Sequence, residues 1–178
     1  MASSVAISIE EYLHNVYRPD CDYVDGDLIE RNVGEFPHAM LQGILVRQFW
    51  DLAREVPIRV VPELRIRTGP KRFRIPDICV MRKTQAPESV LTHPPLLCIE
   101  ILSPEDRMTR VMERVKEYLE FGVEHVWIVD PQTRTAYVRS GEIVQEVRDR
   151  LETTNPHISI DLAAMFAELD RESSTIEE

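Results

Sequence analysis

The chain has 178 residues, of which 43% are hydrophobic and 29% charged, and its formal net charge is −10. This length and balance are typical of one globular domain with its own core. The acidic excess argues against strong nonspecific binding of polyanions, which depends on Lys and Arg neutralising phosphates. We expect a single domain over residues 1–169 and an acidic, disordered tail over residues 170–178.

The sequence also indicates the setting of the protein. No apolar run approaches the roughly 20 residues of a membrane-spanning helix, and the polar start at residues 1–5 does not resemble a signal peptide. The three cysteines, Cys21, Cys79 and Cys98, lack the CxxC spacing of zinc sites. We therefore expect reduced thiols in a cytoplasmic protein that does not bind membranes.

The first third of the chain predicts a helix, a hairpin and a longer helix. A capping-box pattern starts a short helix over residues 9–16. Asp25-Gly26 lies between two short alternating runs, which predicts a β-hairpin over residues 23–30. Apolar residues at helical spacing then predict an amphipathic helix over residues 35–55.

Strand-like runs fill most of the remaining chain. A helix is expected between two of them, beginning at Ser103-Pro104 or at Met108 and ending at Phe121, with Gly122 as its C-terminal stop. Residues 158–166 allow a last helix. Strands are expected over residues 57–61, 63–67, 74–80, 96–102, 123–130, 135–139 and 143–147. This order of elements predicts an α/β domain with a mixed central sheet and an N-terminal hairpin.

Two of the expected strands each carry one carboxylate among apolar residues, Asp77 in the first and Glu100 in the second. A buried carboxylate without a partner costs several kcal/mol or more, so a shared partner is expected. Antiparallel pairing with Asp77 opposite Glu100 also brings Cys79 opposite Cys98, with Cβ atoms about 5 Å apart. Mg²⁺ suits such a pair because it takes one or two carboxylates together with waters and phosphate oxygens.

A second interpretation needs no metal. Nearby arginines such as Arg65 or Arg74 can neutralise the two acids through salt bridges. Basic residues gather around the first of these strands, and they indicate either a local basic face or ordinary solvated charge.

The ordered set of these features resembles the PD-(D/E)XK nuclease superfamily and, more closely, the bacterial Uma-type family of proposed endonucleases. The match covers about residues 10–140 and is carried by Asp25-Gly26, His38, Arg74-Ile-Pro-Asp77, Glu100-Ile-Leu-Ser-Pro104, Lys116 with Tyr118, Gly122-Val123, and Trp127-Ile-Val-Asp-Pro131. The resemblance implies a restriction-endonuclease-like fold, in which helices flank the mixed central sheet.

The resemblance also implies a metal site. Asp77, Glu100 and the backbone carbonyl of Ile101 would hold Mg²⁺, with Mn²⁺ as a substitute. The superfamily pattern has a Lys two residues after the second acid, where this chain has Leu102. The resemblance therefore assigns the active-site lysine to Lys116 on the following helix, at the edge of its buried stripe.

Several assignments stay open at this point. Lys116 can instead pair on the surface with Glu113 and Glu120 at helical spacing. His38 lies on the inward side of its helix, where a histidine is either a hydrogen-bonded core residue or a catalytic residue. The remaining candidates for a second metal shell or for positioning water are Glu30, Glu35 and Glu63.

The implied function is a Mg²⁺-dependent endonuclease that hydrolyses phosphodiester bonds, in DNA rather than RNA, and acts as a homodimer. Nucleic acid is then the partner, and its binding is expected to be weak because the chain is acidic. A noncatalytic module that binds nucleic acid or protein and a domain devoted to self-association are the alternatives.

Overall fold

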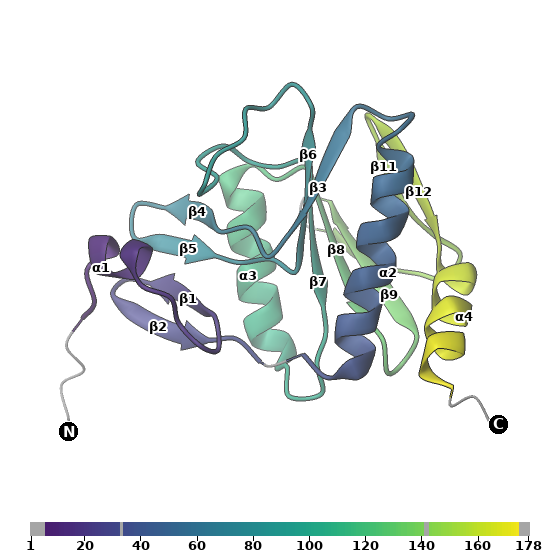
Figure 1. The fold of residues 1–178 in the computed structure, drawn as a ribbon, viewed down its shortest axis with the longest axis horizontal. Helices are drawn as coiled ribbons and strands as arrows, with labels where there is room; N and C mark the ends of the chain where they lie inside the picture. The colour runs from purple at the N-terminus through teal and green to yellow at the C-terminus, as the bar shows by residue number, and fades with distance from the viewer. Residues whose placement is uncertain (1–5, 33, 141–142, 175–178) are drawn as a thin grey trace.

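The computed structural model describes residues 6–32, 34–140 and 143–174. A six-stranded sheet forms its centre (Figure 1). The strands lie in the spatial order β10 (Ile143–Val147), β9 (Thr135–Ser140), β8 (His125–Asp130), β7 (Leu97–Ile101), β6 (Ile78–Arg82) and β3 (Ile58–Pro62). The sheet is mixed, as expected, because β7 and β8 pair in parallel and the other neighbours are antiparallel.

The parallel pair follows from a helical crossover between its strands. Helix α3 (Met108–Phe121) connects β7 to β8, and parallel neighbours require a connection of this kind. The helix ends where the sequence predicts, at Gly122, whose φ of 107° is the left-handed conformation that favours glycine.

Helices cover both faces of the central sheet. Figure 1 shows α3 on one side and α2 (Phe36–Leu52) on the other, with α4 (Leu162–Ser173) beside α2. Because side chains alternate along β7, Leu97, Ile99 and Ile101 belong to the core beneath α2, whereas Cys98 belongs to the core beneath α3.

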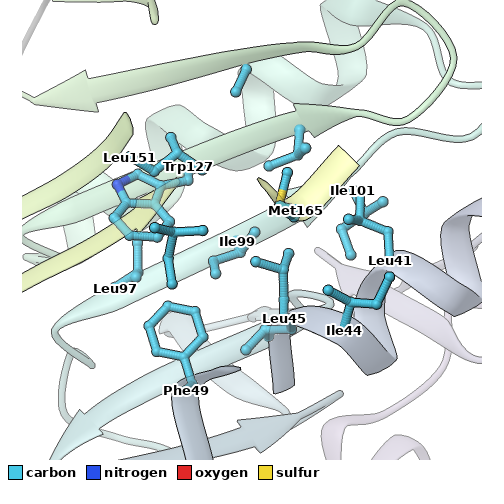
Figure 2. Close-up of a cluster of buried hydrophobic side chains, with 14 of the residues drawn as sticks. Leu41, Ile44, Leu45, Phe49, Leu97, Ile99, Ile101, Trp127, Leu151 and Met165 are labelled. Carbon is cyan, nitrogen blue, oxygen red and sulfur yellow. The ribbon is translucent and has the colours of Figure 1, made fainter. Parts of the chain in front are cut away.

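The core beneath α2 is the larger of the two. Figure 2 shows α2 side chains such as Leu45 and Phe49 lying against the central strands, with the ring of Phe49 6.0 Å from that of Trp127. Burial of apolar surface on this scale is the main favourable contribution to folding.

A four-stranded sheet formed by the N-terminal part of the chain lies at the side of α3. It contains the expected hairpin, and its order is β2 (Asp27–Glu30), β1 (Cys21–Val24), β5 (Arg72–Arg74) and β4 (Ile66–Gly69). The hairpin turn uses positive φ angles at Asp25 (52°) and Gly26 (106°). The expected helix before the hairpin is α1 (Ile9–His14), whose first turn is capped by the hydroxyl of Ser8.

The expected strand over residues 74–80 is divided between the two sheets. Arg74 ends β5 in the smaller sheet, and Ile78 begins β6 in the central sheet. Pro76 lies in the connection, where its missing N–H breaks no ladder. Asp77 therefore sits at the point where the chain enters the central sheet.

The C-terminal expectation needs correction. The predicted helix over residues 158–166 begins only at Leu162, because β12 (His157–Asp161) pairs with β11 (Arg150–Thr154) as a separate hairpin. The helix extends to Ser173, so residues 170–173 of the expected disordered tail are helical. Residues 175–178 of that tail lie outside the described residues.

Buried charges connect the smaller sheet to α3. Arg74 pairs with Asp22 on β1 at 2.9 Å and with Glu117 on α3 at 2.8 Å, and Arg72 also reaches Glu117, at 2.9 Å. Burial alone would raise the pKa of Glu117, but the hydrogen bonds and charges of the two arginines lower it below its ordinary value.

Gly43→Ala and Gly122→Ala should change stability in opposite directions. A Cβ at Gly43 meets nothing within 4 Å, so alanine should raise the free energy of unfolding by about 0.5–1 kcal/mol through helix propensity. At Gly122 alanine should lower it by about 1–2 kcal/mol because of the left-handed backbone. Urea unfolding measures both values, and equal effects would contradict the assigned conformations.

Glu117→Gln should lower the free energy of unfolding by about 2 kcal/mol at pH 7, because the buried Arg74 then keeps only Asp22 as a charged partner. A carboxylate whose pKa is lowered by folding stabilises the protein above the unfolded-state pKa, about 4.3, and loses that contribution as the pH falls through its folded-state value. The difference from wild type should therefore persist at pH 6 and shrink below pH 4. Urea titrations at several pH values test this, and a pH-independent difference would contradict it.

Candidate active site

The pairing of β6 with β7 sets the geometry of the two acids. Cys79 lies opposite Cys98, which confirms the register predicted from the sequence. Two further residues along this register place Asp77 across from Glu100. Both acids are buried, with 3% and 2% of their surface exposed, and their charge must therefore be compensated by nearby groups.

Three groups surround the carboxylate of Asp77. The guanidinium of Arg31 donates to Oδ1, and His38 Nε2 lies 3.5 Å from the same oxygen. The backbone N–H of Ile101 donates to Oδ2 at 2.6 Å. On its other side His38 Nδ1 lies 3.2 Å from the hydroxyl of Ser103, so the predicted inward His38 connects Asp77 to the loop after β7.

Helix α3 supplies both partners of Glu100. Arg114 donates to Oε2 through Nε at 2.9 Å, its Nη2 lies 2.8 Å from the same oxygen, and the hydroxyl of Tyr118 donates to Oε1 at 2.7 Å. Arg114 and Tyr118 are four residues apart, so they project from the same face of the helix. All four carboxylate oxygens of the pair thus have a partner in the protein.

The arginines that neutralise the acids differ from those suggested by the sequence. Arg65 instead lies over the ring of Tyr12, 4.4 Å from its centroid, and Arg74 belongs to the network with Glu117. Arg31 is 46 residues from Asp77 in the sequence, and no local pattern indicates such a contact. The four-residue spacing of Arg114 and Tyr118 is the sequence pattern that could have indicated their shared contact with Glu100.

The two acids have different protonation behaviour. Burial alone would raise the pKa of Asp77, but the hydrogen bond from His38, the charges of Arg31 and His38 and the N–H of Ile101 lower it below its usual value. Burial and the neighbouring charge of Asp77 raise the pKa of Glu100, against the opposing effects of its cationic neighbours and Tyr118. Paired carboxylates with pKa values moved apart are typical of functional sites.

The structure does not bring Lys116 to the acids. Its side chain is 69% exposed, and Nζ lies 3.6 Å from Glu120, which is the surface pairing considered as an alternative. Two residues correspond to about 200° around a helix, so Lys116 and the inward-facing Arg114 point in nearly opposite directions. Arg114 is the cation that α3 brings to the acid pair.

The three secondary acids lie outside the contacts of the pair. Glu30 ends β2 and lines the pocket described below. Glu35 is the exposed N-cap residue of α2. Glu63 is exposed, although its backbone N–H donates to the carbonyl of Asp77 at 3.1 Å.

A pocket of about 360 Å³ lies next to the acid pair. Arg31 and Arg114 form part of its wall, so each has one side toward an acid and one toward the pocket. The complete charged lining is Asp22, Glu30, Glu105, Asp106, Glu113, Arg31, Arg74, Arg107, Arg110 and Arg114. With five acids and five arginines this wall carries no large net charge.

The donor atoms of the pair suit a hard divalent cation. Two adjacent carboxylates are what Mg²⁺ takes from a protein, with waters completing its six positions. Among the described residues no group of three or more His, Cys, Asp or Glu side chains could hold a metal, so a site here would depend on the two acids, backbone oxygen and water.

The three cysteines are free and buried, and no described helix is long and apolar enough to cross a membrane.

Comparisons with known proteins identify the fold and the family of the chain. The crystal structure of a putative nuclease of the DUF820 group from Anabaena variabilis has the same fold, with a TM-score of 0.79 over 92% of this chain and 99% of that one at 22% identity. The fold is therefore nuclease-like. The chain belongs to the Uma2 family, described as putative restriction endonucleases, whose model matches residues 9–167. No curated protein sequence matches the chain.

Arg114→Ala should lower the free energy of unfolding by about 3 kcal/mol, because it leaves Glu100 buried without its charged partner. Lys116→Ala is the matched control on the same helix and should change this free energy by less than about 0.5 kcal/mol. Denaturant unfolding at pH 7 separates the two. Similar losses in both variants would contradict the placement of the two side chains.

Proposed function

We propose that the protein is a metal-dependent endonuclease that hydrolyses phosphodiester bonds, with DNA as the preferred substrate. The observation that carries this proposal is the buried pair of Asp77 and Glu100 on neighbouring segments of the central sheet. Membership of a family described as putative restriction endonucleases supports it, as does the pocket lined by arginines beside the pair.

Asp77, Glu100 and the carbonyl of Ile101 are the proposed ligands of Mg²⁺, or of Mn²⁺ in its place. A bound divalent ion would stabilise the charge that develops on the phosphate and lower the pKa of an attacking water. The protein holds the two carboxylates in position before a metal binds. The N–H of Ile101 fixes one oxygen of Asp77 at 2.6 Å, and Tyr118 fixes one oxygen of Glu100 at 2.7 Å.

Arg114 is proposed to take the role that the sequence assigns to Lys116. It touches Glu100 and also faces the pocket, so it can neutralise negative charge on a phosphate held there. His38 is proposed to orient Asp77 through Nε2, which lies 3.5 Å from Oδ1 of that residue. Burial alone would lower the pKa of His38, but its hydrogen bond to Asp77 and the charge of that residue raise it.

Substrate binding is proposed to be weak and only slightly dependent on salt. Besides Arg31, Arg74 and Arg114, the pocket wall contains Arg107 and Arg110. Acids of the same wall offset these cations, and the chain carries −10 overall. Few phosphate contacts give a shallow dependence of affinity on salt, as well as a low affinity.

Cutting both strands of a duplex requires two active sites, so a homodimer is part of the proposal. One tryptophan is available for such contact, because Trp50 on α2 is 65% exposed while Trp127 is buried. A cytoplasmic setting is also proposed, in keeping with three free cysteines.

A noncatalytic binding module is the second candidate, and a specific observation favours it. Every oxygen of the acid pair already has a hydrogen-bond partner, and two of these partners are guanidinium groups. Such a closed arrangement is stable without a metal. The two candidates differ in whether the wild-type protein cleaves nucleic acid when Mg²⁺ or Mn²⁺ is added.

Asp77→Asn and Glu100→Gln should each reduce metal-dependent nicking of plasmid DNA by about a thousandfold or more, because metal-ion catalysis contributes several kcal/mol to transition-state stabilisation. Glu120→Gln, at an exposed position of α3, is the control and should cleave as wild type does. Circular dichroism would establish that each variant is folded. Normal cleavage by folded Asp77→Asn would refute the assignment, and binding without cleavage by wild type would favour the second candidate.

A further inference from the structure

Arg31 is in an unusual position for an arginine beside a proposed metal ligand. Its guanidinium contacts Oδ1 of Asp77, while its side chain remains 20% exposed and lines the pocket. The side chain of Asp77 is only 4% exposed. Arg31 therefore covers Asp77 on the side that faces the pocket.

The backbone of Arg31 is fixed although its side chain is not enclosed. The residue directly follows β2, and its N–H donates to the carbonyl of Asp20 at 3.0 Å. From this fixed point the side chain extends out of the smaller sheet to an acid of the central sheet. Rotation about side-chain bonds alone can take the guanidinium from Asp77 into the pocket.

The other oxygen of Asp77 is held more firmly. Oδ2 accepts the N–H of Ile101 on β7, and that donor can withdraw only if the backbone of the central sheet moves. A divalent ion approaching from the pocket would therefore bind at Oδ1, where the guanidinium now lies. His38 Nε2 is 3.5 Å from the same oxygen but does not line the pocket. Two cations at one carboxylate oxygen repel each other strongly in a buried setting, so Arg31 is the group that must leave.

We infer that Arg31 is an internal counter-ion that occupies the cation position at Asp77, and that binding of a divalent ion displaces it into the pocket. The inference rests on the proposed function, because it assumes that Asp77 is a metal ligand. It adds a mode of regulation. Without metal, Arg31 neutralises Asp77, so the site is stable and its metal position is occupied by the guanidinium.

The pocket offers the displaced guanidinium a new partner. Glu30 lines the pocket and can accept it, and so can a phosphodiester bound there, which a guanidinium recognises through two parallel hydrogen bonds. A phosphate that draws Arg31 away from Asp77 would raise the affinity for metal, and metal would raise the affinity for phosphate by the same factor. Substrate and metal would then bind cooperatively.

Titration with Mn²⁺ alone tests the inference without depending on catalysis. Calorimetry or Mn²⁺ paramagnetic resonance at pH 7 would give the dissociation constant of the whole folded chain. Arg31→Ala should bind Mn²⁺ about tenfold to a hundredfold more tightly than wild type, because the ion no longer competes with a charge-assisted hydrogen bond. Arg110→Ala removes the same charge from the same pocket wall and should change the affinity by less than about threefold.

Further variants separate the possible failures. If Arg31→Ala does not fold, Arg31→Gln keeps polar bulk at the position and should show the same tightening. Loss of Mn²⁺ binding in Asp77→Asn together with unchanged or weaker binding in folded Arg31→Ala or Arg31→Gln would overturn this inference alone. Wild-type affinity in Asp77→Asn would instead refute the proposed metal site. An equal gain in Mn²⁺ affinity in the Arg110→Ala control would show that the gain comes from the loss of any positive charge near the pocket. That result would also overturn the inference.

Discussion

Compensation of two buried negative charges is the constraint on which the rest of this structure depends. The pairing of β6 with β7 brings Asp77 and Glu100 together in a nearly water-free position, where uncompensated carboxylates would cost more than the net stability of a typical domain. Three parts of the structure each contribute a partner for these acids. Arg31 comes from the smaller sheet, His38 from α2 and Arg114 from α3.

The same contacts link stability to the proposed chemistry. The guanidinium groups that make the closed site stable also occupy the positions where a metal and a phosphate would be bound. The metal position is therefore not empty before metal binds. In the proposed site a divalent ion replaces guanidinium charge, and the pocket beside it provides space for the displaced group. The network of Arg74 and Glu117 holds the smaller sheet, and hence Arg31, against α3.

The features that the sequence predicts correctly are those set by interactions between residues close together in the chain. The Asp25-Gly26 turn requires positive φ angles, and the end of α3 requires Gly122. The register of β6 against β7 follows once Asp77 is set opposite Glu100 on two strands whose side chains alternate. These features need no knowledge of distant contacts. The pair of Asp77 and Glu100 was predictable for the same reason.

The remaining features depend on tertiary contacts. Arg31 reaches Asp77 only after two sheets have been placed side by side, and a residue outside every motif gives no signal of this. On α3 the family resemblance favoured Lys116, and the helical stripe alone did not rank the residues at its edge. The β11–β12 hairpin was missed because Ile158 and Ile160 suit both a strand and the first turn of a helix.

A crystal structure of the protein soaked with Mn²⁺ tests the central claim most directly. We expect anomalous density for one ion in contact with both Asp77 and Glu100, with the guanidinium of Arg31 turned into the pocket. Density elsewhere, or none at saturating Mn²⁺ with Arg31 still on Asp77, would contradict it. The acid pair would then be a closed structural salt-bridge cluster.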